Sequence, residues 1–300
     1  MTDALVKALE ELESRKRELD HLNSELFDTN RGVLALYAEL DEKAEHLQRA
    51  DDLKTRFLSN MSHEFRTPLN SILALSQLLT NQVDGPLSQE QHKQVGYIRQ
   101  SATELLDMVN DLLDLAKVES GKIALRMAEL AIDDLFAALR GMLRPTIASS
   151  RVELLFESAA SLPRLYSDEA KVTQILRNFI GNALKFTERG EVRVSASLLA
   201  PGQRPPGRAR ACEHESILLG VADTGIGIAA SDRERIFEEF SQVEHALQQR
   251  VKGTGLGLPL CRKLAAVLGG HVWVESELGV GSKFYLLVPR GEPVKPGEDL

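Results

Sequence analysis

The sequence predicts a multidomain protein that is helical in its N-terminal part and α+β in its C-terminal part. Residues 1–53 carry a seven-residue apolar repeat, and residues 54–122 hold two amphipathic segments joined by a turn. In residues 123–291, strand-like runs alternate with helix-like runs. The expected architecture is an N-terminal coiled coil, an antiparallel helical hairpin forming a dimeric four-helix bundle, an α/β-sandwich domain, and a tail at residues 292–300.

The first segment has an apolar residue at every seventh position, and a repeat of this kind keeps one stripe of a helix facing a partner helix. A second stripe is mixed, since Leu22 and Leu36 fit it but Arg15, Thr29 and Lys43 do not. The alternative is one amphipathic helix lying on a globular domain, but ~50 helical residues would extend roughly 75 Å, too far for one small domain to cover. A parallel dimer is favoured by the stripe of Leu5, Leu12, Leu19, Leu26, Val33, Leu40 and Leu47.

The hairpin is predicted from a helix, a turn and a second helix. The first helix continues to about Leu79 and is expected to kink at Pro68, because proline removes a backbone donor. Residues 81–86 contain Gly and Pro and signal a turn. Ser88, with a glutamine three residues later, is a capping signal for a second helix that runs to about Val118.

The C-terminal domain is predicted from runs of two periodicities. Helices are expected over residues 132–143, 169–186 and 256–268, and strands over residues 152–156, 191–198, 216–221, 271–275 and 283–288. The Pro-, Gly- and Arg-rich stretch Pro201–Ala211 lies between two strands and predicts an exposed, mobile hairpin loop, with a basic binding loop as a less favoured interpretation.

Charge and hydropathy exclude several functions. The net charge of −8 disfavours direct nucleic-acid binding. The longest apolar run is shorter than the ~18 residues of a membrane span, and the charged N-terminus does not resemble a signal peptide, so we expect a cytoplasmic protein. Cys212 and Cys261 match no metal-binding or redox spacing and are expected to be reduced.

The first chemical motif is the segment around His63. Glu64 follows His63 directly, and Thr67 lies one helical turn later on the same face. An imidazole can attack phosphorus with one ring nitrogen when a carboxylate accepts the proton of the other. On its own, a His–Glu pair on a helix usually lies on the solvated surface. The residue four positions after His63 is a threonine rather than a histidine, which excludes the His-Glu-x-x-His zinc motif.

The second motif lies on the predicted helix 169–186. Asn178 and Asn182 are four residues apart and Lys185 follows three later, so their side chains share a face. Amide oxygens suit Mg²⁺, and an ammonium suits phosphate oxygens. A solvated polar face is the alternative, although apolar residues occupy the other faces.

The third motif, Asp223-Thr-Gly225-Ile-Gly227, ends a predicted strand. An aspartate there can accept a hydrogen bond from an exocyclic amine, and the glycines allow close approach of a ring or a phosphate. The glycine spacing excludes a dinucleotide-binding fingerprint, and no Gly-Lys-Ser/Thr follows to make a Walker A loop.

The fourth motif is the glycine-rich turn Gly253-Thr254-Gly255-Leu256-Gly257, which opens the predicted helix 256–268. Free N–H groups at a helix N-terminus bind phosphate. The polar residues 242–252 before it could close over a nucleotide as a lid.

The five motifs, in this order and counting Gly279–Phe284 near the C-terminus, resemble the sensor histidine kinases of bacterial two-component systems. Residues 54–122 resemble a HisKA-type dimerisation and histidine-phosphotransfer hairpin. Residues 123–291 resemble the ATPase domain of the gyrase- and MutL-like GHKL superfamily, which has a Bergerat fold. The resemblance implies ATP and Mg²⁺ as cofactors, a homodimer, a response-regulator receiver domain as partner and a separate sensor or upstream input protein.

The resemblance also implies roles for individual residues. The phospho-acceptor would be His63, with Glu64 as general base and Thr67 positioning water for dephosphorylation of the partner. The Mg²⁺ ligands would be Asn182 and Asn178. The nucleotide contacts would comprise Lys185 at phosphate, Asp223 at the adenine amine, Gly225 and Gly227 at the adenine wall, Gly253, Thr254, Gly255, Leu256 and Gly257 at the phosphates, and Ser282 through water.

Three other functions remain open from the sequence. The chain could act mainly as a phosphatase of a response regulator, as a catalytically degenerate coiled-coil scaffold, or as a serine kinase of the same superfamily. Intact His63, Asn182 and Asp223 count against the scaffold. The favoured function is ATP-dependent autophosphorylation of His63 followed by transfer to an aspartate.

Overall fold

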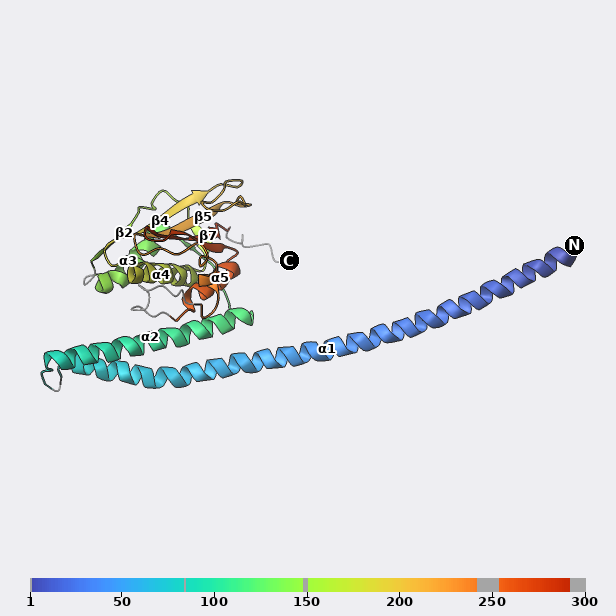
Figure 1. Ribbon diagram of the computed structural model, residues 1–300, viewed down its shortest axis with the longest axis horizontal. Coiled ribbons are helices and arrows are strands. Elements are labelled where there is room, and N and C mark those ends of the chain that lie inside the picture. Colours follow the sequence, from blue (N-terminus) through green and yellow to red (C-terminus); the bar gives the residue numbers. More distant parts are fainter. Residues whose placement is uncertain (1, 84, 148–150, 242–253, 292–300) are drawn as a thin grey trace. The chain divides into compact units, whose positions relative to one another are not determined.

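The computed structural model describes residues 2–83, 85–147, 151–241 and 254–291 (Figure 1). It divides into two units, residues 1–57 and residues 58–300. Helix α1 (Thr2–Thr80) belongs to both units and contains Pro68. It ends one residue after the predicted Leu79. Within the described ranges, no helix has the length and hydropathy of a membrane span.

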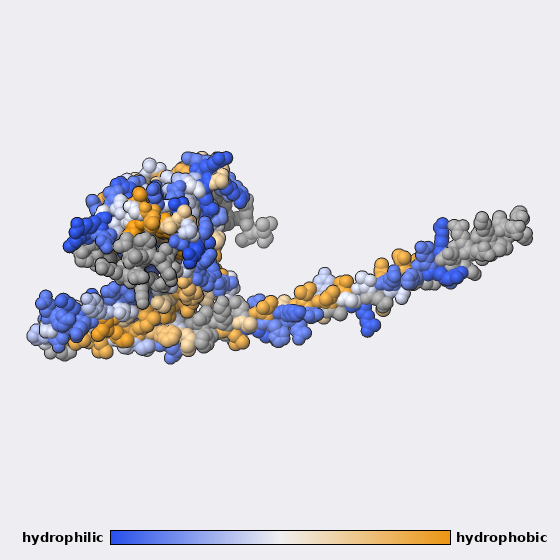
Figure 2. All heavy atoms as spheres, viewed as in Figure 1, coloured by the Kyte–Doolittle hydropathy of each residue, from blue (hydrophilic) through white to orange (hydrophobic). Residues whose placement is uncertain are grey.

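The apolar stripe predicted to face a partner helix is exposed in the first unit. Its described side chains are exposed to between 42% at Val33 and 72% at Leu47, whereas the side chain of Leu5 lies outside the described residues. Figure 2 shows apolar residues along α1 among hydrophilic ones. The ion pair of Lys43 with Glu39, 2.6 Å long and one turn apart, adds only ~0.3–0.5 kcal/mol. Local pairs therefore support the helix without covering its apolar stripe.

Helix α2 (Gln89–Glu119) begins at the predicted cap. The Ser88 Oγ accepts a hydrogen bond from the Gln91 N–H at 3.2 Å, and the Ser88 N–H donates to the Gln91 Oε1 at 2.9 Å. This reciprocal pair is a capping box, and it satisfies two donors that a helix start would otherwise leave without acceptors.

The two helices of the hairpin are antiparallel. Arg66 donates to Asn110 at 2.9 Å, and Arg99 donates to Gln77 at 3.3 Å. The later residue of α1 thus pairs with the earlier residue of α2, as in an antiparallel pair of helices. The predicted helix–turn–helix arrangement is confirmed.

A five-stranded sheet follows, in the order β2-β4-β5-β7-β6. β2 pairs parallel with β4, and the other neighbours pair antiparallel. Three helices lie on one side of it (Figure 1), which confirms the predicted α/β sandwich. The strands are β2 (Val152–Phe156), β4 (Gly190–Leu199), β5 (Ser216–Asp223), β6 (His271–Glu277) and β7 (Gly281–Pro289), and the helices are α3 (Ile132–Ile147), α4 (Glu169–Phe186) and α5 (Gly257–Val267).

The main core lies between this sheet and its helices. On β4, Val192 and Val194 are fully buried, whereas Arg193 between them is exposed, which is the period of two expected of a strand. α4 contributes Phe179, a fully buried side chain whose ring centroid lies 5.3 Å from that of Phe284 on β7. Because the apolar face of α4 packs against the sheet, its polar face remains available to bind a ligand.

Three short elements were not predicted. β1 (Ala128–Leu130) pairs antiparallel with β3 (Leu165–Ser167), and η1 (Arg235–Phe237) is one turn of 3-10 helix. Elements of three residues are too short to show a periodicity in sequence.

The predicted exposed hairpin loop does connect β4 with β5, but it is partly packed. Pro205 is buried, and the indole Nε1–H of Trp273 donates to the Pro206 carbonyl at 3.1 Å. The Arg208 guanidinium lies 5.0 Å from the Trp273 ring centroid. The loop is exposed at most of residues 201–211, as predicted, but through Pro205, Pro206 and Arg208 it also covers apolar side chains on the sheet face opposite the helices. These side chains form a separate small cluster of Leu199, Cys212, Leu218, Trp273 and Tyr285.

Candidate functional site

The two asparagines of α4 lie together. The Asn182 Nδ2 donates to the Asn178 Oδ1 at 3.0 Å, and both residues are half-buried. The helix starts at Asp168, whose carboxylate accepts from the Lys171 N–H. Because the bond uses the amide nitrogen of Asn182, it leaves the carbonyl oxygen of that residue for a hard cation. The donor set therefore fits the predicted Mg²⁺.

Lys185 lies one turn further along α4. Its Nζ is 5.7 Å from the Phe186 ring centroid. Burial lowers the pKa of Lys185, and the carboxylate of Glu104 on α2 acts in the opposite direction. Contact of this ammonium with phosphate stays a prediction.

Asp223 ends β5, as predicted. Both hydrogen bonds that its carboxylate accepts within the described ranges go to Oδ1, from the Gly225 N–H at 2.9 Å and the Ser282 N–H at 3.3 Å. Burial raises the pKa of Asp223, and these two N–H groups oppose that shift. The arrangement fixes the carboxylate and leaves Oδ2 to accept from a ligand amine.

Gly227 occupies a position that only glycine fits. Its φ is +68°, and a Cβ there would lie 2.0 Å from the Glu277 carbonyl oxygen. The loop is also joined to α4, because the Ile226 N–H donates to the Phe186 carbonyl at 3.3 Å. The Asp223 segment and the asparagine helix are thereby brought together.

The glycine-rich turn lies against Asn178. A Cβ on Gly257 would lie 2.1 Å from the Asn178 Nδ2, so the first turn of α5 contacts the predicted metal ligand. The Thr254 Oγ1 accepts from the Leu256 N–H at 3.2 Å, and Gly255 accepts from the Phe240 N–H at 3.1 Å. Gly253 and the predicted lid, residues 242–252, lie outside the described residues.

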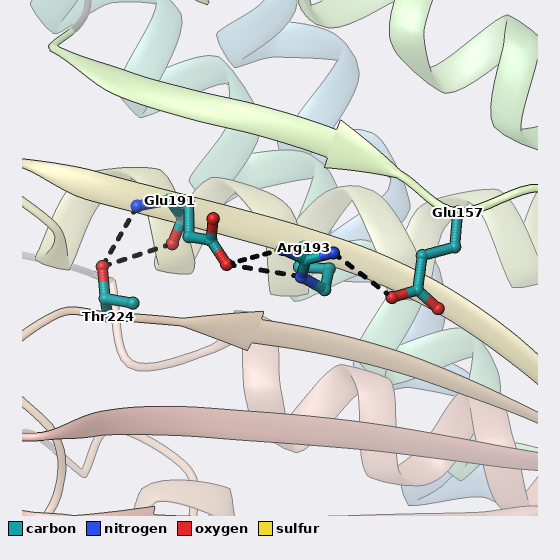
Figure 3. A network of polar contacts seen from close by, with 4 residues as sticks. All are labelled: Glu157, Glu191, Arg193 and Thr224. Carbon is teal, nitrogen blue, oxygen red and sulfur yellow. Dashed lines mark hydrogen bonds and ion pairs between the residues drawn. The ribbon is translucent and has the colours of Figure 1, made fainter.

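A polar network runs along β4, an inner strand of the sheet, and reaches Thr224 next to Asp223 (Figure 3). The Thr224 Oγ1 accepts from the Glu191 N–H at 3.1 Å. The Glu191 carboxylate accepts from Arg193 at 2.9 Å, and Arg193 also lies 3.6 Å from Glu157, just beyond β2. The network spans three segments and anchors the backbone that follows Asp223.

A cavity of about 450 Å³ opens beside the ends of β5, β7 and β6. Asp223, Ser276 and Ser282 line it together with charged residues that include Arg233 and Lys283. The row from Asp223 to Ser276 therefore borders a polar cavity.

The predicted phospho-acceptor segment lies on α1. His63, Glu64 and Thr67 are exposed, and the Thr67 Oγ1 donates to the His63 carbonyl at 3.2 Å. His63 and Thr67 thus occupy adjacent turns of one exposed face, as the sequence predicts.

Comparison with known families and proteins decides the assignment. Residues 53–121 match the His Kinase A (phospho-acceptor) domain family. Residues 167–292 match the family of histidine kinase-, DNA gyrase B- and HSP90-like ATPases. An uncharacterised sensor-like histidine kinase of Rhizobium meliloti is 38% identical over 256 residues, which are 85% of this chain and 46% of the relative. The chain belongs to the two-component sensor histidine kinases.

Two other proteins are similar to this histidine kinase over most of its length. The autoinducer 2 sensor kinase/phosphatase LuxQ of Vibrio cholerae is 34% identical over 84% of this chain and 28% of its own length. The crystal structure of full-length ShkA in complex with AMPPNP superposes with a TM-score of 0.61 at 36% identity, covering 80% of this chain and 46% of that one. The chain spans less than half the length of each of these three relatives.

Ser276 of this histidine kinase was not predicted from the sequence. Its Oγ contacts the Ile228 N–H, the Gly281 carbonyl and the Ser282 Oγ. A signal was present, because Ser276 follows Val272 and Val274 at the inward positions of β6. A hydroxyl at such a position needs hydrogen-bond partners.

Proposed function

We propose that this chain transfers the γ-phosphate of ATP to His63 and then to an aspartate of a response-regulator receiver domain. The observations that carry the proposal are the approach of Gly257 on α5 to Asn178 on α4, the hydrogen bond of the Ser282 N–H to Asp223, and the bond from the loop after Asp223 to α4. Membership of the family, with its ATPase domain and its phospho-acceptor domain in one chain, supports it. So does the AMPPNP complex of the structural relative.

ATP would be held by groups of three kinds. Asp223 would accept from the adenine amine through Oδ2, beside the wall formed by Gly225 and Gly227. Thr254 to Gly257 and Gly253 would bind the phosphates, because the first N–H groups of a helix donate to anions. Lys185 would add positive charge there.

Asn182 and Asn178 would hold Mg²⁺. When bound, the ion would neutralise charge on the phosphate oxygens during transfer. The hydrogen bond between the two amides orients them, so the Asn182 Oδ1 and the remaining lone pair of the Asn178 Oδ1 would be the ligands of the ion.

The chemical step would use His63 and Glu64. One imidazole nitrogen attacks the γ-phosphorus, so an N–P bond forms while the P–O bond to ADP breaks. Glu64 takes the proton from the other ring nitrogen, which keeps a neutral phosphorylated imidazole. Exposure of both residues fits a group that must meet ATP and, later, a receiver domain.

Labelling of the purified chain tests this function. With γ-labelled ATP and Mg²⁺ the protein should acquire label that is lost in acid and retained in base, because a phosphoramidate is acid-labile. Acid-stable label would indicate the serine kinase instead. Absence of label with retained ATP binding would favour the scaffold.

We also propose that Thr67 positions the water that removes phosphate from the receiver. Its hydroxyl is exposed one turn from His63, and one relative is named a kinase/phosphatase. Thr67→Ala should keep autophosphorylation within about 2-fold, while hydrolysis of a phosphorylated receiver falls at least ~10-fold. The measurement is phosphate release from a receiver that this kinase has itself labelled, after ATP is removed.

Ser71→Ala is the matched control, because Ser71 is exposed and its hydroxyl donates to the Thr67 carbonyl in the same way. An equal loss of hydrolysis rate in both variants would indicate a general perturbation of helix α1 rather than a role of the Thr67 hydroxyl. An unchanged hydrolysis rate in Thr67→Ala would remove the threonine from the phosphatase step.

A homodimer is proposed from the exposed apolar stripe of α1. Burial of a side chain such as Leu40, which is 62% exposed, contributes ~1.5–3 kcal/mol. A second copy of the chain would cover the stripe in register. An upstream sensor protein could then act on this coiled coil.

A further inference from the structure

Three side chains stand in one row across the ends of β5, β7 and β6. The register pairs Asp223 with Ser282, and Ser282 with Ser276. The two serines are buried, and their Oγ atoms lie 2.9 Å apart, a distance at which either can donate. The direction of this bond decides what Ser282 offers to a ligand beside Asp223.

The surroundings of Ser276 settle that direction. A hydroxyl has one proton and two lone pairs. The Gly281 carbonyl, 2.9 Å from the Ser276 Oγ, can only accept, so the Ser276 proton is directed there. The Ile228 N–H donates to one lone pair at 2.7 Å. The remaining lone pair of Ser276 therefore receives the proton of Ser282.

The Ser282 hydroxyl can then only accept hydrogen bonds from a ligand. Its N–H already donates to the Asp223 Oδ1 at 3.3 Å, and its O–H donates to Ser276. The Arg233 guanidinium donates to the Ser276 carbonyl and holds β6 in place. Carboxylate and hydroxyl thus present two acceptors side by side.

We propose that Ser276 is a positioning residue for base selection, because it fixes Ser282 as an acceptor and so favours a 6-amino purine over a 6-oxo purine. A 6-amino group donates to such acceptors, directly or through water, whereas a 6-oxo group brings a further acceptor against them. This inference rests on the proposed function, which places the base at Asp223. If Ser276 is removed, the Ser282 proton is released and can turn to a 6-oxo group.

Binding of ADP and of IDP, measured by calorimetry with Mg²⁺, tests the proposal. Wild type should prefer ADP, and Ser276→Ala should reduce that preference on the order of 10-fold, as expected for loss of one or two oriented hydrogen bonds. Ser276→Thr keeps the hydroxyl and should restore it. Ser195→Ala is the matched control, since Ser195 lies on β4 in the same sheet but on the face opposite the helices.

Ser282→Ala provides a second route should Ser276→Ala fold poorly. It removes the acceptor itself and should lower the preference by a similar factor, with no further loss in the double variant. Equal weakening of ADP and IDP in Ser276→Ala would show a merely structural role and overturn the inference. Unchanged ADP affinity in Asp223→Asn would instead show that the base lies elsewhere, and the proposed site and the inference would both fail.

Discussion

His63→Gln is expected to abolish acid-labile labelling by ATP, with a fall of at least ~100-fold. Glutamine keeps a polar side chain on an exposed helical position but has no ring nitrogen that can attack phosphorus. ATP binding should stay unchanged, because the predicted nucleotide contacts lie on α4, β5, β7 and α5. The measurement is phosphoprotein formed under initial-rate conditions, with ATP affinity determined in parallel.

His92→Gln is the control, since His92 is an exposed histidine on the other helix of the same hairpin. It should label as wild type does. If His63→Gln still accepts acid-labile phosphate, another histidine is the acceptor, and the chemistry assigned to the His63–Glu64 pair is wrong.

Gly257→Ala is expected to lower autophosphorylation about 100-fold, because a shift of about 1 Å in a positioning group can cost that much. The new Cβ would lie 2.1 Å from the Asn178 Nδ2, so this amide must move. Asn178 accepts from Asn182, and the displacement passes to both proposed Mg²⁺ ligands. The kinase rate and the Mg²⁺ concentration for half-maximal rate are the measurements.

Gly141→Ala is the control that separates displacement of Asn178 from a general effect of replacing a glycine by alanine. Gly141 lies in α3, and nothing lies within 4 Å of a Cβ placed there. It should keep full activity and gain up to ~1 kcal/mol of stability from alanine in a helix. Gly257→Ala should remain folded, since the short Asn178 side chain can move away from the new methyl group. Wild-type activity in Gly257→Ala would show that Asn178 has room to move without consequence for catalysis.

Much of this fold follows from local rules that the sequence displays. The capping box at Ser88 and the periodicity of residues 169–186 each place a helix without reference to distant residues, and α4 has the predicted bounds. Strands such as β5 were located by apolar runs, although the structure extends β5 to Asp223. These features depend on neighbours in the chain, which is why pattern alone located them.

Other features depend on contacts between distant segments. β1 and β3 exist as a pair, and neither has a periodicity of its own. The approach of Gly257 to Asn178 joins residues 79 positions apart, so the sequence showed the two motifs but not that they touch. Ser276 is part of the candidate site only because β6 pairs with β7.

The packed loop between β4 and β5 has an optical consequence. Trp273 is the single tryptophan of the chain, and its ring is stacked on Tyr285 at 5.1 Å between centroids. Its indole is bonded to the loop and belongs to the small cluster on the side of the sheet away from α4 and α5. Intrinsic tryptophan emission therefore reports when residues 200–212 leave the sheet. A change in that emission on adding nucleotide would mean that binding on the helix-covered face of the sheet alters the packing on the opposite face.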